Sequence, residues 1–252
     1  MIKYNEVYHG DVLELLSKIE SQSIEFIWGD PDYNVGIDYG GADYTMDWKD
    51  YNDWYIKLAR ECMRVLTDDG NAFFMNYPKQ NSHLAVNYLY GRSYDLQEYA
   101  WVYNTSIGNG EGRFTTAHRT ILHARNSEDN IFLIDGFGHD HAESTANDKR
   151  VLKRGARGSR NPLSWFYFDL VKNVSKEKTF HPCQVPQVLY TKFLNTFTFE
   201  SSKCLILFGG SGGEIVVTEE ANRQWLSAEL HEPYVNLINS RLEAIRKQKK
   251  LF

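Results

Sequence analysis

The sequence of 252 residues lacks the features that mark several classes of protein. Its three cysteines, Cys62, Cys183 and Cys204, are an odd set without metal-ligand spacing, which argues against a zinc site. No apolar run approaches the roughly 18 residues of a membrane span, and the opening MIKYNEVYHGD is too polar for a signal peptide. We therefore expect a cytoplasmic protein with reduced thiols, no metal and no membrane contact.

Internal repeats and low-complexity tracts are also missing, and the composition is that of an ordinary globular protein. Hydrophobic residues make up 42% and charged residues 24%, which at this length supports one large α/β domain with a small insertion. The net charge of -5 argues weakly against a polyanionic partner. Cations nevertheless gather in DKRVLKRGARGSR at 148–160, which indicates either a solvated basic loop or a contact with nucleic acid.

The apolar pattern alternates between strand and helix along most of the chain. A short strand, a turn and a helix are expected over 5–19, and further strands over SIEFIWGD, NAFFMNY, EYAWVYN, TILHAR, CLILF and QWLSAEL. Helices are expected near 50–66, with TDDG ending that helix, near 79–91, and over 186–197 and 233–248. The helix near 50–66 should turn Trp54, Leu58, Cys62 and Val65 inward. Strands alternating with helices predict an α/β fold with a doubly wound, mostly parallel sheet.

The periodicity dissolves between residues 135 and 178, where glycine, polar and basic residues surround the aromatic cluster SWFYFDL. This segment is the best candidate for an insertion outside the main sheet. We therefore divide the chain into residues 1–134, an insertion over 135–178, and residues 179–252, with the first and last parts forming one domain.

Asp30, Pro31 and Tyr33 directly follow the predicted strand SIEFIWGD. An acid, a proline and an aromatic ring in this place form either an ordinary turn or a catalytic tip. Considered alone, Tyr33 in a chain with 16 tyrosines is better explained as a buried or turn residue. The rest of the chain has to decide between the two hypotheses.

A glycine cluster follows the strand CLILF in LILFGGSGGEIVV, at 205–217. Glycines there let the backbone turn sharply and approach a ligand closely, although a tight structural loop has the same composition. Glu229 ends the next predicted strand, where an acid can accept hydrogen bonds from both ribose hydroxyls of a nucleoside. Because Glu214 rather than Lys or Ser follows the glycines, the loop suits a ligand without phosphates, such as S-adenosylmethionine.

Three stretches together resemble the amino-methylating DNA methyltransferases. DPDY at 30–33 is similar to their Asp-Pro-Pro-Tyr catalytic motif, HPCQVP at 181–186 to a His-Pro-Thr-Gln-Lys-Pro motif, and FGGSGG at 208–213 to their Phe-x-Gly-x-Gly cofactor loop. The catalytic motif comes first and the cofactor loop last, which is the permuted order of the beta class. Weaker similarity covers nearly all of the chain except about 135–164.

This resemblance implies a seven-stranded sheet with S-adenosylmethionine over the carboxyl ends of the strands. Asp11 would hold the adenine amino group of the cofactor, although a helix N-cap explains this residue equally well. His181 on its own is better explained as a structural histidine. The cofactor-binding residues that the resemblance implies are Asp11, His181, Cys183, Gln184, Phe208, Gly209, Ser211, Gly212 and Glu229.

The chemistry of amine methylation accounts for the first motif. The lone pair of an exocyclic amine is delocalised into the base, so Asp30 and the carbonyl of Pro31 would accept its two hydrogens and localise the lone pair. The base must leave the duplex, and Tyr33 would stack on it. Asp30, where some relatives have Ser, implies adenine rather than cytosine. The candidate DNA contacts are Arg113, His118, Lys149, Arg150, Lys153, Arg154, Arg157 and Arg160, which predicts salt-dependent binding.

The chain departs from the family pattern in three places. Asp32 replaces the second proline, Ile206 and Leu207 replace an Asp-Pro pair before Phe208, and Val185 replaces a lysine. Three alternatives therefore stay open: a catalytically degenerate fold that binds nucleic acid or a partner, a cytosine-N4 enzyme, and a methyltransferase acting on protein glutamine. Many beta-class relatives form dimers, so the resemblance also implies a homodimer, and the family includes enzymes of restriction-modification systems.

Overall fold

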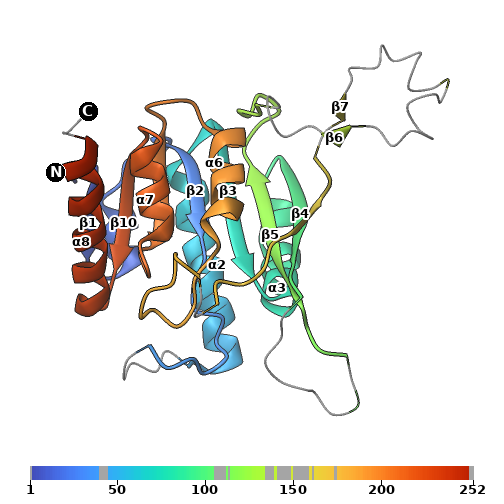
Figure 1. Ribbon diagram of the computed structural model, residues 1–252. Helices are drawn as coiled ribbons and strands as arrows, with labels where there is room; N and C mark the ends of the chain where they lie inside the picture. The colour runs from blue at the N-terminus through green and yellow to red at the C-terminus, as the bar shows by residue number, and fades with distance from the viewer. Residues whose placement is uncertain are drawn as a thin grey trace.

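The computed structural model describes residues 2–39, 45–104, 112, 114–133, 139–140, 149, 159–160, 162–172 and 175–249. Its centre is an eight-stranded sheet in the order β1-β10-β9-β2-β3-β5-β4-β8 (Figure 1). The strands are β1 (Glu6–His9), β10 (Gln224–Glu229), β9 (Lys203–Phe208), β2 (Ile24–Gly29), β3 (Leu66–Asn76), β5 (His118–Arg125), β4 (Asp95–Val102) and β8 (Trp165–Tyr167). A separate antiparallel pair joins β6 (His139–Asp140) and β7 (Ser159–Arg160).

Strand direction confirms the predicted mostly parallel sheet. Only β5 pairs antiparallel with its two neighbours in this sheet, while each of the other pairings is parallel. Consequently the first residues of β5 lie at the same edge as the last residues of β2, β3 and β4. The carboxyl ends of the parallel strands form the lower edge in Figure 1.

Helices cover both faces of the sheet, as the alternating pattern predicts. One face packs against α1 (Val12–Ser17), α2 (Trp48–Val65) and α3 (Pro78–Asn87), which leads into a short 3-10 helix, η1 (Leu89–Gly91). The other face packs against α6 (Gln187–Phe197), α7 (Gly213–Glu220) and α8 (Glu232–Lys249). Figure 1 shows α6, α7 and α8 in front of the sheet.

The helix α2 shows how the sequence determines one of these contacts. Asp47 caps it by accepting a hydrogen bond from the backbone of Lys49, at 2.9 Å. Leu58, Cys62 and Val65 are buried as expected, but Trp54 is only partly buried. The buried stripe continues instead through Tyr51 and Tyr55, the residues one turn apart from each other on the inner face.

Two expectations about element boundaries are wrong. The helix ends at Val65, before TDDG, as expected, but the strand expected over NAFFMNY starts earlier, because β3 begins at Leu66 and runs through TDDG. Leu66 pairs with Ile24 and Asn71 with Phe26, so TDDG forms an irregularity between two paired positions of the strand. The sheet also has eight strands rather than seven. The eighth, β8, comes from the segment expected outside the sheet.

The strand β8 joins the sheet because it satisfies the open edge of β4. Its backbone pairs with β4 from Ala100 to Val102, and the indole nitrogen of Trp101 donates to the carbonyl of Phe168 at 2.8 Å. Phe166 packs its ring against those of Tyr99 and Phe193, with centroids 6.1 and 5.3 Å away. Burying an aromatic side chain against its neighbours stabilises the added strand.

Candidate active site at the carboxyl edge of the sheet

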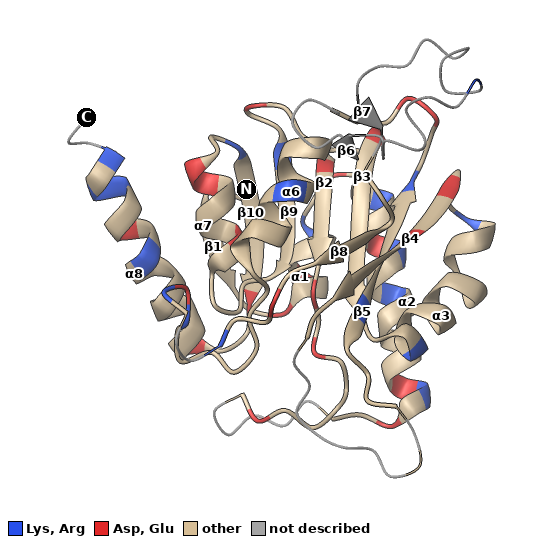
Figure 2. Ribbon diagram, turned by 45° about the vertical axis from the view of Figure 1, so that its right-hand side comes forward, with Lys and Arg blue, Asp and Glu red and all other residues tan. Residues whose placement is uncertain are grey.

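The sheet reverses its winding between β9 and β2. From β2 the chain crosses one face through α2 to β3, whereas from β9 it crosses the opposite face through α7 to β10. The loops after β2 and β9 therefore separate, and open α/β sheets bind ligands in the crevice at such a point. Acidic residues, red in Figure 2, occur on the loops along this edge.

Asp30 begins the loop after β2 and lies half-buried at this edge. Its Oδ1 accepts a hydrogen bond from the hydroxyl of Tyr33. Burial raises the pKa of the Asp30 carboxyl from 3.8 to about 6, while the Tyr33 hydrogen bond and the charge of Arg119 act in the opposite direction. The carboxylate form thus dominates at neutral pH and can accept hydrogen bonds.

Asp32, which replaces a proline of the family motif, shapes the loop. Its Oδ1 accepts from the backbone N–H of Asn34 at 2.7 Å, and its carbonyl accepts from the hydroxyl of Tyr51 at 2.7 Å. Asn34 has a φ of 58°, a left-handed conformation that asparagine tolerates. The side-chain turn and the hydrogen bond to α2 therefore restrict the loop, as the ring of the missing proline would.

The ring of Tyr33 lies in an aromatic cluster rather than free in solvent. It contacts Tyr77, just after β3, edge to face with centroids 5.2 Å apart, and the guanidinium carbon of Arg119 lies 5.1 Å from its centroid. Arg119 was missed by sequence reasoning. Only the antiparallel direction of β5 brings its first residues to this edge, and no local pattern signals that pairing.

The glycine cluster after β9 is shaped by close contact with α8. A Cβ on Gly209 would lie 2.7 Å from the Cδ1 of Ile238, and one on Gly212 would lie 3.0 Å from its Cγ1. Gly210 and Gly212 have φ values of 49° and 75°, which L side chains rarely adopt. These positions therefore require glycine for the backbone path, and the loop leads directly into the first turn of α7.

Glu229 ends β10 beside this loop. Its Oε2 accepts from the backbone N–H of Gly210 and its Oε1 from that of His231, both at 2.8 Å. Burial raises the pKa of the Glu229 carboxyl, and the two backbone donors partly offset that rise. The structure thus places the acid within hydrogen-bonding distance of the glycine loop, as the strand spacing predicts.

Asp11 lies after β1 at the same edge and caps α1. Its Oδ1 accepts from the backbone of Leu13 at 2.8 Å and of Glu14 at 3.3 Å. The helix N-cap that we considered as an alternative is therefore present. This cap uses Oδ1 only, so it is compatible with a ligand contact through Oδ2.

The segment before α6 brings His181 over the glycine loop. A Cβ on Gly210 would lie 3.3 Å from Nε2 of His181, and the imidazole ring also packs against Tyr234, with centroids 4.6 Å apart. Its Nδ1 donates to the carbonyl of Cys183, which leaves Nε2 as an acceptor in the neutral ring. Burial lowers the pKa of His181 to about 4, so the ring is neutral at pH 7.

Cys183 and Gln184 differ in their roles. The thiol of Cys183 is exposed, and its pKa is raised by partial desolvation and by the nearby carboxylate of Asp30. Gln184 instead holds its own loop together: Oε1 accepts from the backbone of Thr179 at 2.7 Å, and Nε2 donates to the carbonyl of Glu177 at 2.9 Å. Its amide shapes the segment that carries His181.

Glu214 is a second residue that sequence reasoning did not place in the site. It lies in the first turn of α7 and is 9% exposed, and a backbone hydrogen bond to its carboxyl group only partly offsets the effect of burial. Burial, with the negative charge of Asp30, raises the pKa of its carboxyl to about 8. The signal that the sequence offered for Glu214 is its position directly after a glycine loop of the kind that binds ligands.

The expected DNA contacts fall mostly outside the described residues. These are Arg113, Arg150, Lys153, Arg154 and Arg157, and for Arg160 only the backbone, in β7, is described. Lys149 is exposed, and His118 begins β5, half-buried and paired with Val102. Within the described ranges no helix is long and apolar enough to span a membrane, and no cluster of His, Cys, Asp or Glu could hold a metal ion.

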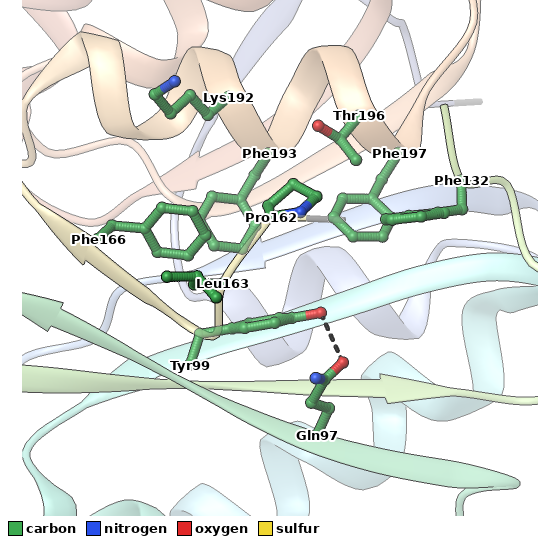
Figure 3. Close-up of a pocket in the computed structure, with 10 residues that line it drawn as sticks. All are labelled: Gln97, Tyr99, Phe132, Pro162, Leu163, Phe166, Lys192, Phe193, Thr196 and Phe197. Carbon is green, nitrogen blue, oxygen red and sulfur yellow. Dashed lines mark hydrogen bonds between the residues drawn. The ribbon is translucent and has the colours of Figure 1, made fainter. Parts of the chain in front are cut away.

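A separate cavity of about 190 Å³ lies between α6 and the strands β4 and β8 (Figure 3). Aromatic rings face it from both sides, with Tyr99 donating to Oε1 of Gln97 at 2.9 Å on its lower wall. None of the expected catalytic or cofactor-binding residues lines this cavity.

Comparison with known proteins identifies the family. The family described as DNA methylase, with N6 and N4 methyltransferases in its title, matches residues 24–240. The chain belongs to the DNA methylase family. This match confirms the beta-class amino-methyltransferase that the order of the motifs suggested.

Relatives of this DNA methylase include a type II methyltransferase and a DNA adenine methyltransferase. It is 27% identical over 98% of its length to the type II methyltransferase M.BamHI of Bacillus amyloliquefaciens, of which it spans 59%. It is 23% identical over 94% of its length to the DNA adenine methyltransferase YhdJ of Escherichia coli strain K12, of which it spans 82%.

Solved structures support the fold of the DNA methylase chain. The PvuII DNA methyltransferase, whose title says cytosine-N4-specific, superposes with a TM-score of 0.69 at 17% identity, covering 95% of this chain and 90% of that one. The M1.HpyAVI–SAM complex gives 0.62 at 17% identity, covering 94% and 98%. At this identity the two structures bear on the fold alone.

Proposed function

We propose that this chain is a DNA methyltransferase that transfers a methyl group from S-adenosylmethionine to the exocyclic amine of adenine. The observation that carries the proposal is the meeting of two motifs at one edge. The loop after β2 presents Asp30, and the loop after β9 presents glycines backed by Glu229. Family membership supports the reaction class, and the geometry at this edge supports the assignment of the residues to it.

The residues present fit this cofactor. A Cβ at Gly209 would lie 2.7 Å from Ile238 and one at Gly210 would lie 3.3 Å from Nε2 of His181, so the loop leaves little room for side chains and presents its backbone. Glu229 lies against Gly210 with a carboxylate that can accept from ribose hydroxyls. Asp11, His181, Cys183, Phe208 and Ser211 would complete the pocket. When bound, the cofactor supplies a methyl group on a positively charged sulfur.

The residues of the chain then prepare the amine. Asp30 is an ionised acceptor at neutral pH, and the carbonyl of Pro31 follows it in the same loop. Accepting the two amino hydrogens favours a tetrahedral nitrogen and stabilises the positive charge that develops on it. The base has to leave the duplex to reach Asp30, and the ring of Tyr33 would then contact it. Cations of the segment 148–160 would contact phosphates.

The test is methyl transfer by purified protein to DNA, followed by sequencing that detects the modified base. Asp30→Ala should lower transfer by about 100-fold or more, the usual cost of removing a preorganised polar contact, while cofactor binding remains. Asp50→Asn, at an exposed position in α2, is the matched control and should leave transfer unchanged. Near-normal activity of Asp30→Ala would refute the assignment of the catalytic residue.

Two alternatives have specific support and the same experiment separates them. A cytosine target is left open by the family itself, whose title names N4 as well as N6 methyltransferases, and base detection would identify it. A non-catalytic DNA-binding protein is favoured by Ile206 and Leu207, which are buried and leave no carboxylate at the end of β9. Intact DNA binding without methyl incorporation would establish that alternative.

A further inference from the structure

Arg119 is a cation that the topology of the sheet brings to the catalytic motif, where its charge acts on Asp30. It is the second residue of β5, paired with Trp101 of β4, and next to it Thr120 pairs with Asn76 at the end of β3. Since β5 is antiparallel, this start of the strand lies at the carboxyl edge where Asp30 begins its loop. The side chain is half-buried and shares a sheet face with Trp101.

The guanidinium of Arg119 is enclosed by aromatic rings. Its Cζ lies 5.0 to 5.5 Å from the centroids of four rings, and Nη1 donates to the hydroxyl of Tyr103 at 2.8 Å. The four rings belong to Tyr33, Tyr77, Trp101 and Tyr103. A guanidinium is attracted to the faces of aromatic rings, more strongly where water is excluded. The cage therefore holds the guanidinium in one place.

Tyr33 links this cage to the catalytic carboxylate. Its ring faces the guanidinium, while its hydroxyl donates to Oδ1 of Asp30. A second link is electrostatic, because the positive charge of Arg119 lowers the pKa of Asp30 against the rise that burial causes. Movement or loss of the guanidinium would thus affect both the ring and the charge of the carboxylate.

We propose that Arg119 is a positioning residue for methyl transfer, which fixes the ring of Tyr33 and keeps Asp30 ionised as the acceptor of the target amine. The proposal rests on the proposed function and adds a residue to it. Arg119 acts through Tyr33 and Asp30, so it need not touch the cofactor or the base.

Other ionisable groups face Asp30 from the surrounding elements, and they are acids. They are Asp32 and Tyr39 of the same loop, Tyr51 and Tyr55 of α2, Cys183 before α6 and Glu214 of α7. Ionisation of any of them would favour the neutral form of Asp30. Arg119 supplies the opposing positive charge.

Two substitutions separate the roles of charge and shape. Arg119→Lys keeps a positive charge but loses the planar stacking, whereas Arg119→Met keeps an unbranched side chain of similar length without charge. Arg125→Met is the matched control, because Arg125 ends the same strand far from the site and pairs with Asp95 at 2.7 Å.

The first measurement is the pH profile of single-turnover methyl transfer. In the wild type the acidic limb should lie near pH 6, and Arg119→Met should move it upward by about one pH unit or more, as expected for removing a nearby opposite charge. For a move of one unit, the relative loss of rate is then about fivefold greater at pH 6 than at pH 9 and approaches tenfold at lower pH. Arg119→Lys should be slower at every pH with the limb nearly unmoved, and Arg125→Met should keep the wild-type profile.

The second measurement does not need activity. The carboxyl carbon of Asp30, assigned by comparison with Asp30→Asn, should titrate at higher pH by NMR in Arg119→Met than in the wild type. An unchanged titration, or an equal loss of rate at all pH values with a lowered melting temperature, would overturn the proposal. If the wild type transfers no methyl group at all, the proposed function fails, and the titration still decides the link between Arg119 and Asp30.

Discussion

Glu214 should make the stability of this protein fall as the pH rises above 5. In the folded chain its carboxyl has a pKa of about 8, whereas an exposed glutamate has one near 4.5. Below pH 4.5 the carboxyl is protonated in both the folded and the unfolded chain, so it does not lower the free energy of unfolding. Between these values the unfolded chain releases its proton and the folded chain does not, so folding loses stability across the interval.

The magnitude follows from the width of that interval. Each pH unit is equivalent to about 1.36 kcal/mol, so the ceiling for the whole interval is on the order of 5 kcal/mol. Arg241 of α8 exerts a favourable Coulomb effect, and ionisation will also relax the site. We therefore expect Glu214→Gln, which preserves size without charge, to be about 2 to 4 kcal/mol more stable than the wild type at pH 9.

Urea unfolding at pH 5, 7 and 9 measures this difference. At pH 5 the two proteins should unfold at nearly the same urea concentration, and the gap should widen with pH. Glu220→Gln, at the exposed end of the same helix, is the matched control and should track the wild type. A stability difference between wild type and Glu214→Gln that is the same at pH 5 and pH 9 would refute the reasoning.

Three further predictions concern the loops and the core. Gly209→Ala should lower the free energy of unfolding by about 1 to 3 kcal/mol through the clash with Ile238, as measured by urea unfolding. Ile238→Val should relieve part of that loss in a double-mutant cycle. Gly91→Ala is the control and should have little effect, because open space surrounds Gly91. Asp32→Asn should keep the side-chain turn and the melting temperature, while Asp32→Ala should lower both melting temperature and transfer rate. Burial lowers the pKa of His123 to about 3, so its contribution is present above pH 6.5 and is lost as the pH falls; His123→Gln should therefore show a shallower decline in stability from pH 7 to pH 4.

The doubt that the sequence left at Asp32 is resolved by local contacts. A proline and an aspartate reach a similar loop path by different means, since one restricts φ and the other closes a side-chain turn. Asp32 uses Oδ1 for the turn and its carbonyl for Tyr51, so the loop is tied to α2. The departure from the motif therefore does not by itself argue against a formed catalytic loop.

Residues that depend on local order were predictable. The strand that ends at Gly29, the glycine cluster after Phe208 and the acid at Glu229 each follow from a short pattern of apolar residues and turn formers. Parallel strands then place their carboxyl ends together, which is why motifs about 180 residues apart could be assigned to one site. The family comparison agrees with the reaction class that those motifs suggested.

Residues that depend on pairing across the sheet were not predictable. Strand β8 was expected outside the sheet because three residues carry too weak a pattern to indicate a partner, and its place depends on the open edge of β4. Arg119 reaches Asp30 only because β5 runs antiparallel, and Glu214 is perturbed only because the packed site excludes water from its carboxyl.

The sequence by itself thus determined the fold class, the order of the motifs and the residue types that could activate an amine. The tertiary structure alone decided which charges act on those residues. The physical reason is that periodicity and turn chemistry are local along the chain, whereas burial and Coulomb interaction depend on distances in space, which strand pairing and helix packing establish.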